Sequence, residues 1–157
     1  MTDTIFILNG PNLNLLGTRE PRIYGTQTLA DIGEMLEKRA KALKLKLDIR
    51  QSNHEGDLVD WLHEAMAKAS AVIVNAGGYA HTSVAIRDAA AALTIPVLEV
   101  HLTNIYAREG FRRTSLVGQV ARGSIIGLGA LGYVLALDAA AHLCKGAGAT
   151  QAKSQIQ

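Results

Sequence analysis

Arginines and lysines are distributed very differently along this sequence. Five of the nine arginines lie in two polar segments, Arg19 and Arg22 in the first and Arg108, Arg112 and Arg113 in the second, whereas all seven lysines lie elsewhere. A guanidinium stays charged and binds carboxylates in a bidentate manner, whereas imine formation needs the amine of a lysine. The two segments therefore indicate a site for an anionic substrate and argue against imine chemistry.

Side chains that bind hydroxyl groups accompany these arginines. The polar segments and their flanks contribute Asn12, Asn75, His81, Asp88 and Glu99. Amide, imidazole and carboxylate groups supply both hydrogen-bond donors and acceptors. Together with the arginines, they predict a site for a carboxylate that also carries hydroxyls.

Two other kinds of site receive little support. His81, Asp88, Glu99 and His101 are metal-ligating residue types, but the sequence has no H-x-x-x-H or H-x-H pair. The glycines of segment 127–132 match G-x-G-x-x-G, but the following strand and acidic residue of a dinucleotide fingerprint are missing. We expect neither a metal nor a cofactor, and interpret these glycines as close helix–sheet packing.

Short apolar runs alternate with amphipathic stretches, which predicts five strands and four long helices. The expected strands are 5–8, 45–50, 71–74, 95–100 and 124–126, and the expected helices are 28–45, 57–69, 83–93 and 129–144. This alternation is typical of a doubly wound α/β sandwich. At this length it favours the flavodoxin-like fold, a five-stranded parallel sheet of order 2-1-3-4-5 with helices on both faces.

The predicted strand order brings the polar segments together. In this order strands one and three are neighbours at the topological switch point, and strand four lies beside strand three. The polar segments follow these three strands, so we expect them to meet in one crevice at the carboxyl edge of the sheet. The first segment is unusually long, about 17 residues where ~2–6 are usual. We expect residues 17–26 to form a lid, with Gly17 and Gly25 as hinges.

Length and composition limit the remaining possibilities. A chain of 157 residues with 48% hydrophobic and 19% charged residues is typical of one globular domain, here 1–157, and its last residues, about 146–157, are expected to be frayed. The net charge of +2 gives no support for nucleic-acid binding. No apolar run is long enough to span a membrane, and Asp3 with the short run after it does not resemble a signal peptide. We expect a cytoplasmic protein.

Four stretches of the sequence resemble motifs of the type II 3-dehydroquinate dehydratases. They are LNGPNLNLLGTREPRIYG, QSNHEG, NAGGYAHTSVAIRDA and EVHLTNIYAREGFRRTS, and the resemblance extends from the first strand to the last helix. It implies a hydro-lyase that reversibly removes water from 3-dehydroquinate by anti elimination, through an enolate, to give 3-dehydroshikimate without a metal or cofactor. It also implies a flavodoxin-like subunit that assembles into a dodecamer, a tetramer of trimers. Shikimate-pathway biosynthesis of aromatic amino acids and quinate breakdown both use this reaction.

The resemblance also implies a role for each matching residue. Tyr24 would remove the C2 proton, Arg19 and Arg108 would favour its phenolate, and Asn12 would hold the water that stabilises the enolate. Judged from the residues alone, the tyrosines at 79, 106 and 133 are equal candidates for the base. The resemblance is what selects Tyr24.

The second half of the resemblance concerns the leaving group and substrate binding. His101 would protonate the departing C1 hydroxyl, and Glu99 would orient His101. The substrate would be held by Asn75, His81, Arg112 and the backbone of Leu102 and Thr103, with Asp88 reaching a neighbouring subunit's site.

The sequence departs from the family pattern at positions outside these roles. Ala80 replaces the usual Thr, Gly110 stands where an acidic residue is common, and Arg113 and Thr114 replace a pair of His. We expect these differences to alter how the lid docks and how the subunits contact one another, but not the activity. The alternative function is a catalytically silent flavodoxin-like module that binds a small carboxylate.

Overall fold

The computed structural model describes residues 2–147, apart from the side chain of Tyr24, and it confirms the predicted alternation of strands and helices. The strands are β1 (Thr4–Asn9), β2 (Lys46–Gln51), β3 (Ala71–Asn75), β4 (Val97–His101) and β5 (Gly123–Ile126). The helices are α1 (Pro21–Tyr24), α2 (Leu29–Leu43), α3 (Glu55–Lys68), α4 (Val84–Ala91) and α5 (Leu131–Gly146). Strand β4 begins and ends later than the predicted 95–100, and Pro96, which precedes it, accepts a hydrogen bond from the Val72 N–H but has no N–H of its own to donate.

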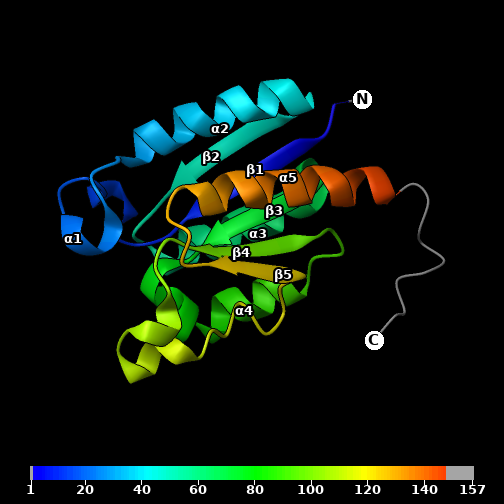
Figure 1. Ribbon diagram of the computed structural model, residues 1–157. Coiled ribbons are helices and arrows are strands. Elements are labelled where there is room, and N and C mark those ends of the chain that lie inside the picture. Colours follow the sequence, from blue (N-terminus) through cyan, green and yellow to red (C-terminus); the bar gives the residue numbers. More distant parts are fainter. Residues whose placement is uncertain (1, 148–157) are drawn as a thin grey trace.

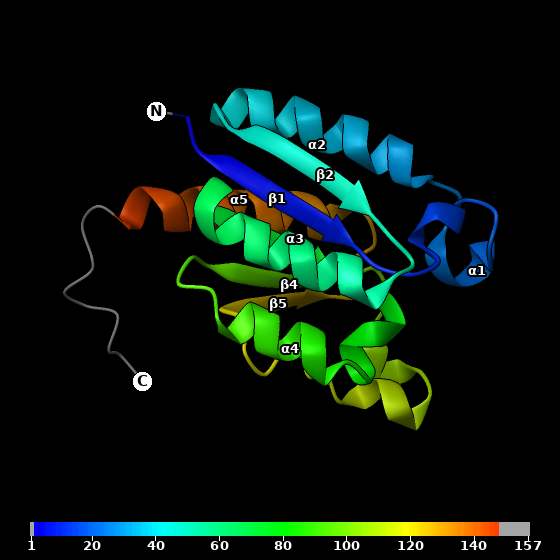
Figure 2. The same cartoon turned by 180° about the vertical axis from the view of Figure 1, so that it is seen from behind.

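The five strands form one parallel sheet in the order β2-β1-β3-β4-β5, as predicted. Helices α2 and α5 cover one face of this sheet (Figure 1), and α3 and α4 cover the other (Figure 2). The carboxyl ends of β2, β1 and β3 are in register, because Asn9 pairs with Gln51 on one side and with Asn75 on the other. The side chains at these three positions therefore start from one edge of the sheet.

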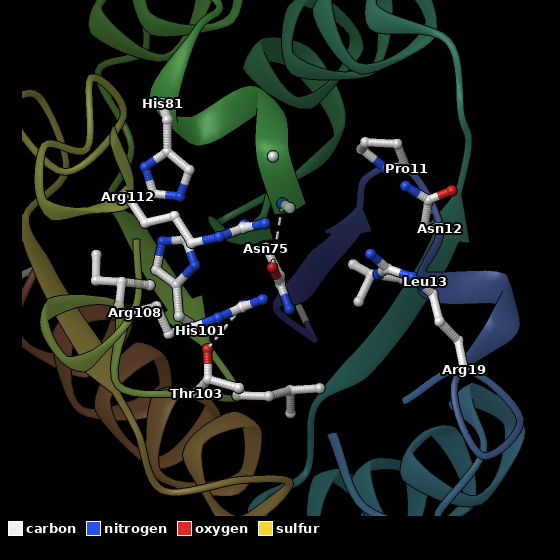
Figure 3. A pocket seen from close by; sticks show the side chains of 14 residues that line it. Pro11, Asn12, Leu13, Arg19, Asn75, His81, His101, Thr103, Arg108 and Arg112 are labelled. Carbon is white, nitrogen blue, oxygen red and sulfur yellow. Dashed lines mark hydrogen bonds between the residues drawn. The ribbon is translucent and has the colours of Figure 1, made fainter. Parts of the chain in front are cut away.

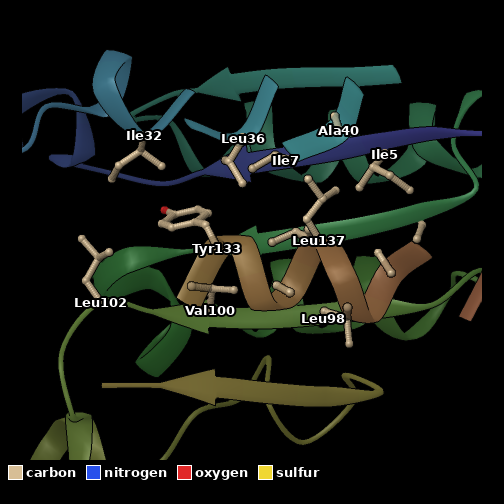
Figure 4. Close-up of a cluster of buried hydrophobic side chains, with 14 of the residues drawn as sticks. Ile5, Ile7, Ile32, Leu36, Ala40, Leu98, Val100, Leu102, Tyr133 and Leu137 are labelled. Carbon is tan, nitrogen blue, oxygen red and sulfur yellow. The ribbon is translucent and has the colours of Figure 1, made fainter. Parts of the chain in front are cut away.

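The two faces of β1 pack into separate cores. Ile5 and Ile7 lie in the cluster beneath α2 and α5 (Figure 4), whereas Phe6 and Leu8 lie in the cluster beneath α3 and α4. Successive side chains of a strand point to opposite faces of the sheet, so an unbroken apolar run suits a strand covered on both sides. This packing fixes β1 in the middle of the molecule and with it the position of the segment that follows Asn9.

The glycines of segment 127–132 have two different roles. Gly132 lies on the side of α5 that faces the sheet, as predicted, but a Cβ atom there would lie 3.5 Å from Ile125 Cγ2 and 3.6 Å from Val100 Cγ1, which is ordinary van der Waals contact. Gly127 (φ 86°) and Gly129 (φ 60°) instead adopt left-handed backbone conformations in the turn before α5. The prediction of close helix–sheet packing does not apply to these two positions, because glycine is favoured there by the left-handed backbone conformation.

Helix α5 continues to Gly146, two residues past the predicted end at 144. The predicted frayed terminus, about 146–157, lies for the most part outside the described residues. Within residues 2–147, no helix has the length and apolar character needed to cross a membrane.

Candidate active site

A pocket opens at the carboxyl ends of β1, β3 and β4, where the sequence predicts a crevice (Figure 3). Side chains after β3 and β4 form one side, those after β1 form the other, and Asn75 lies between them. The lining residues are Pro11, Asn12, Leu13, Arg19, Asn75, Gly77, Gly78, His81, His101, Leu102, Thr103, Ile105, Arg108 and Arg112. The structure therefore brings together the polar segments that follow β1, β3 and β4.

The segments after β1 and β3 touch at the floor of the pocket. Gly10 N donates a hydrogen bond to the backbone oxygen of Asn75 at 2.8 Å. A Cβ atom at position 10 would lie 2.4 Å from the oxygen of Ala76, which is far inside van der Waals contact. Only glycine allows the two backbones to approach this closely.

Asn12 is held by the segment that follows β2. Its backbone is left-handed (φ 69°, ψ −3°), a conformation that asparagine tolerates better than most residues. Its N–H donates to Asn53 Oδ1 at 3.0 Å, and Gln51 Nε2 donates to the same oxygen and to the oxygen of Gly10, each at 3.1 Å. Sequence reasoning treated QSNHEG as a connecting loop. The amide side chains of Gln51 and Asn53, at the end of the strand beside β1, were the sequence signal for these hydrogen bonds.

Arg19 reaches the pocket from the long segment after β1. Its side chain is 39% exposed, and Nη2 lies 3.9 Å from Glu20 Oε2. The sequence predicted a loop here, but the segment contains the short helix α1. This helix begins with Pro21, a residue suited to the first turn of a helix. Tyr24 is the last residue of α1, and its side chain lies outside the described part of the structure.

The end of β4 carries a buried carboxylate and imidazole. Glu99 and His101 are 1% and 5% exposed, and both point to the same face of the sheet because β4 continues through His101. His101 Nε2 lies 3.1 Å from Glu99 Oε2, without a well-aligned N–H···O hydrogen bond. Only the imidazole lines the pocket, so the carboxylate stands behind it.

Two serine hydroxyls also donate to the Glu99 carboxylate. They are Ser115 Oγ, to Oε2, and Ser124 Oγ, to Oε1 at 2.9 Å. Burial raises the pKa of Glu99, but His101 and the two hydroxyl donors outweigh this effect and lower it below its ordinary value. Glu99 is therefore ionised and places a negative charge beside the His101 ring. The two serines escaped sequence reasoning because they lie 16 and 25 residues from Glu99.

His81 stacks on His101, with ring centroids 5.9 Å apart. His81 Nδ1 lies 2.9 Å from the carbonyl oxygen of Thr114. Because a carbonyl can only accept, Nδ1 carries the hydrogen of this bond, and Nε2 of the neutral ring is an acceptor. Burial lowers the pKa of His81, and the positive charges of His101 and Arg112 lower it further, against the opposing effects of Thr114 and of a nearby carboxylate.

Arg108 and Arg112 complete the positive lining of the pocket. Arg108 Nη1 donates to Thr103 Oγ1 at 3.3 Å, and Arg112 Nε donates to the carboxylate of Glu109. The Arg112 side chain is 18% exposed, whereas that of Glu109 is 54% exposed at the rim. With Arg19, three guanidinium groups surround the pocket, which suits an anionic ligand.

Two further candidates, the carboxylate of Asp88 and the guanidinium of Arg113, do not line the pocket of their own chain. Asp88 lies on α4 with its side chain 64% exposed and pairs with Arg87 at 3.0 Å. Arg113 is exposed at the end of the short 3₁₀ helix Gly110–Arg113. Arg22 is likewise exposed and absent from the pocket lining.

Comparison with known proteins gives one consistent result. The sequence pattern of the family described as "Dehydroquinase class II" matches residues 3–141. The chain is 56% identical to the 3-dehydroquinate dehydratase of Halalkalibacterium halodurans over 86% of this chain and 93% of that protein. It is also 56% identical to that of Rhizobium meliloti, over 91% and 97% of the two chains.

Solved structures give the same result for the fold. The type II dehydroquinase from Propionibacterium acnes superimposes with a TM-score of 0.87 at 42% identity, covering 90% of this chain and 98% of that one. That from Butyrivibrio crossotus has a TM-score of 0.87 at 39% identity, with 88% and 97% covered.

Proposed function

Because the chain belongs to the class II dehydroquinase family, we infer that it is a 3-dehydroquinate dehydratase, a hydro-lyase that converts 3-dehydroquinate into 3-dehydroshikimate and water. The relatives confirm the resemblance seen in the four sequence motifs, and they do not favour the silent carboxylate-binding module. The observation that supports this function best in the molecule itself is the pocket, which is lined by three arginines, two histidines and two asparagines.

We propose that the side of the pocket after β1 removes the proton. Tyr24 would act as the base at C2, and Arg19 and Arg108 would stabilise its phenolate, because a positive charge within ~4–6 Å favours an ionised phenol. Asn12 would hold the water that stabilises the enolate oxygen. The hydrogen bond from the Asn12 backbone N–H to Asn53 Oδ1 supports this role, since it fixes the backbone of Asn12 beside the pocket.

The side after β4 would release the leaving group. His101 would donate a proton to the departing C1 hydroxyl, which needs a positively charged ring before the transfer. The Glu99 carboxylate lies 3.1 Å from His101 Nε2, where a charged ring would pair with it. The His101 proton passes to the hydroxyl oxygen as the C1–O bond breaks, and water leaves.

Substrate binding would use the remaining polar groups. Arg112, together with the backbone of Leu102 and Thr103, would hold the carboxylate, and Asn75 and His81 would bind hydroxyls. The neutral His81 ring supports this assignment, because its Nε2 can accept a hydroxyl hydrogen. Among residues 2–147, no lysine lines the pocket, so borohydride should not inactivate the enzyme in the presence of substrate.

We propose that residues 17–26 close over the bound substrate as a lid. Arg19 already lines the pocket, while Pro21–Ile23, next along the chain, are exposed. Closure would exclude bulk solvent from the enolate, apart from the water proposed to bind Asn12, and bring Tyr24 to C2.

The subunits would assemble as a dodecamer, a tetramer of trimers, with Asp88 completing a neighbour's site. Asp88 is exposed and lies outside its own pocket, and Val84 on the same helix is 58% exposed, as expected of residues that a second subunit covers. We further propose that 1–157 is a single catalytic domain that works in the cytoplasm.

A spectrophotometric assay tests the activity directly. The product is a conjugated enone and the substrate is not, so purified protein mixed with 3-dehydroquinate should produce a rising ultraviolet absorbance. Arg122→Ala, at an exposed position outside the pocket, is the matched control and should keep full activity. If the wild type binds 3-dehydroquinate but no absorbance develops, the silent binding module is correct.

A further inference from the structure

A buried tyrosine hydroxyl joins the ends of β1 and β3 behind the pocket. Tyr133, on α5, is 0% exposed, and its ring packs in the core between α2, α5 and the sheet (Figure 4). Its Oη donates to Asn9 Oδ1 at 2.6 Å and accepts from Asn75 Nδ2 at 2.9 Å. Of these three residues, only Asn75 lines the pocket.

The backbone groups at both ends fix the direction of this chain of hydrogen bonds. Asn9 Nδ2 donates to the carbonyl of Arg50 at 3.1 Å, and because a carbonyl only accepts, Asn9 must turn its oxygen towards Tyr133. The hydroxyl hydrogen of Tyr133 is then used on Asn9, and only its lone pairs remain for Asn75.

The opposite end gives the same answer independently. The N–H of Gly77 can only donate, and it lies 3.2 Å from Asn75 Oδ1. The Asn75 amide therefore turns its oxygen to Gly77 and its NH₂ to Tyr133. One NH₂ hydrogen bonds to Tyr133, and the second remains available to a ligand in the pocket.

We propose that Tyr133 is a positioning residue for catalysis: its hydroxyl holds the Asn75 amide in the orientation that presents an N–H donor, rather than a carbonyl acceptor, to the substrate. The inference rests on the proposed function, since it concerns how Asn75 recognises the substrate. An N–H donor of Asn75 binds a substrate oxygen that accepts a hydrogen bond. Without the hydroxyl, only the N–H of Gly77 would oppose rotation of the amide by half a turn, which would present the wrong group to the substrate.

Burial keeps this arrangement in a single protonation state. It raises the pKa of Tyr133 well above the ordinary value for a phenol, so the hydroxyl remains a neutral donor throughout the working pH range. A phenolate would accept from both asparagines and would no longer require the Asn9 oxygen to face it. The two functions of a protonated hydroxyl, one donor and one acceptor, are both used here.

Steady-state kinetics of Tyr133→Phe test the proposal. The substitution keeps the packed ring and removes only the hydroxyl, so we expect KM for 3-dehydroquinate to rise about 3- to 10-fold, the equivalent of one hydrogen bond, with kcat changed less than about twofold. A purely structural role would reduce the folded fraction and so lower the apparent kcat, leaving KM unchanged. In an Asn75→Ala background, Tyr133→Phe should raise KM no further.

Two controls separate positioning from folding. Ser70→Ala removes a partly buried hydroxyl that donates to Asp3 at 2.7 Å, away from the pocket, and should leave KM unchanged. Asn9→Ala removes the acceptor of the Tyr133 hydroxyl without touching the pocket and should raise KM as Tyr133→Phe does. Wild-type KM in a folded Tyr133→Phe protein, or a KM effect that adds in full to that of Asn75→Ala, would overturn the proposal.

A neutron structure of the wild-type protein provides a test that needs no variant. We expect the Tyr133 deuterium between Oη and Asn9 Oδ1, and the Asn75 ND₂ group facing Oη. A deuterium directed at Asn75 would overturn the proposal. Because the wild type is assayed in parallel, failure of the dehydratase activity itself would show as absent product rather than as an unchanged KM.

Discussion

The two sides of the pocket are held in place by very different means. On the β4 side, Glu99 and His101 are 1% and 5% exposed and belong to a central strand. On the β1 side, Asn12 is exposed and Arg19 is 39% exposed, and both belong to a segment outside the sheet. The β4 side, proposed to release the leaving group, is thus built into the core, whereas the β1 side, proposed to remove the proton, lies on the surface.

The difference indicates how the proposed chemistry is divided. A protonated histidine costs free energy to bury, and the strand supplies a buried, hydroxyl-bound carboxylate beside it before any substrate arrives. A base that must be covered from water can instead be brought in by a segment that moves when substrate binds. We therefore expect substitutions on the β1 side to lower turnover. On the β4 side, we expect different substitutions to affect substrate binding, the pH dependence of stability, and turnover separately.

Tyr24→Phe should have the largest effect. The ring is kept and only the proposed base is removed, so turnover should fall at or beyond the upper end of the ~10²–10⁴-fold range for general acid–base catalysis. Binding of a competitive inhibitor, measured by calorimetry, should remain within about threefold of wild type. Turnover above a few per cent of wild type would assign the base to another residue and remove the proposed division between the two sides.

Arg112→Ala should weaken binding more than it affects chemistry. The guanidinium is largely buried at the pocket and would pair with the substrate carboxylate, and charged hydrogen bonds contribute about 1.5–3 kcal/mol. We expect KM to rise about 10- to 100-fold with a much smaller change in kcat. Arg113→Ala, at an exposed position of the same 3₁₀ helix, is the matched control and should leave KM unchanged. The reverse pattern in Arg112→Ala, a loss of kcat at constant KM, would argue for a catalytic role instead.

Glu99→Gln should change how stability depends on pH. The pKa of Glu99 is lower in the folded protein than in the unfolded chain, so its ionised form contributes stability above the unfolded value of about 4.5, and this contribution is lost as the pH falls through the folded pKa. The melting temperature should therefore drop less in the variant than in the wild type as the pH is lowered from about 5 through the range below 4.5. Equal slopes in the two proteins would mean that the buried carboxylate is not selectively stabilised in its ionised form.

Glu109→Gln should have the smallest effect. The Glu109 carboxylate is bound to Arg112 at the exposed rim, and hydrogen bonding to that guanidinium is the main reason that its pKa is lowered. Exposed ion pairs contribute little, ~0–1 kcal/mol, so KM should change less than about fivefold. A larger rise in KM would show that Arg112 depends on this exposed partner and that the β4 side is less self-contained than the structure indicates.

Sequence patterns were sufficient for the fold, and three of the five arginines that they singled out, Arg19, Arg108 and Arg112, line the pocket. The apolar run of β1 and the periodic stripes of the helices are local, and the strand order follows from connection rules. The hydrogen bonds that orient the site are not local: Tyr133 and Asn9 are separated by 124 residues and Asn12 and Asn53 by 41. No pattern in the sequence distinguishes Tyr133 from other tyrosines, because its partners are set by the packing of α5 on the sheet.

Exchange of the C2 proton is the measurement that tests the division of labour most directly. In deuterated water, His101→Ala should retain the base but lack the acid, so NMR should show one C2 proton of 3-dehydroquinate exchanging faster than the uncatalysed background while dehydration falls ~10²–10⁴-fold. Tyr24→Phe should give neither exchange nor dehydration above background. Exchange catalysed by Tyr24→Phe, or its absence in a His101→Ala protein that binds substrate, would contradict the assignment of proton removal to the β1 side and leaving-group release to the β4 side.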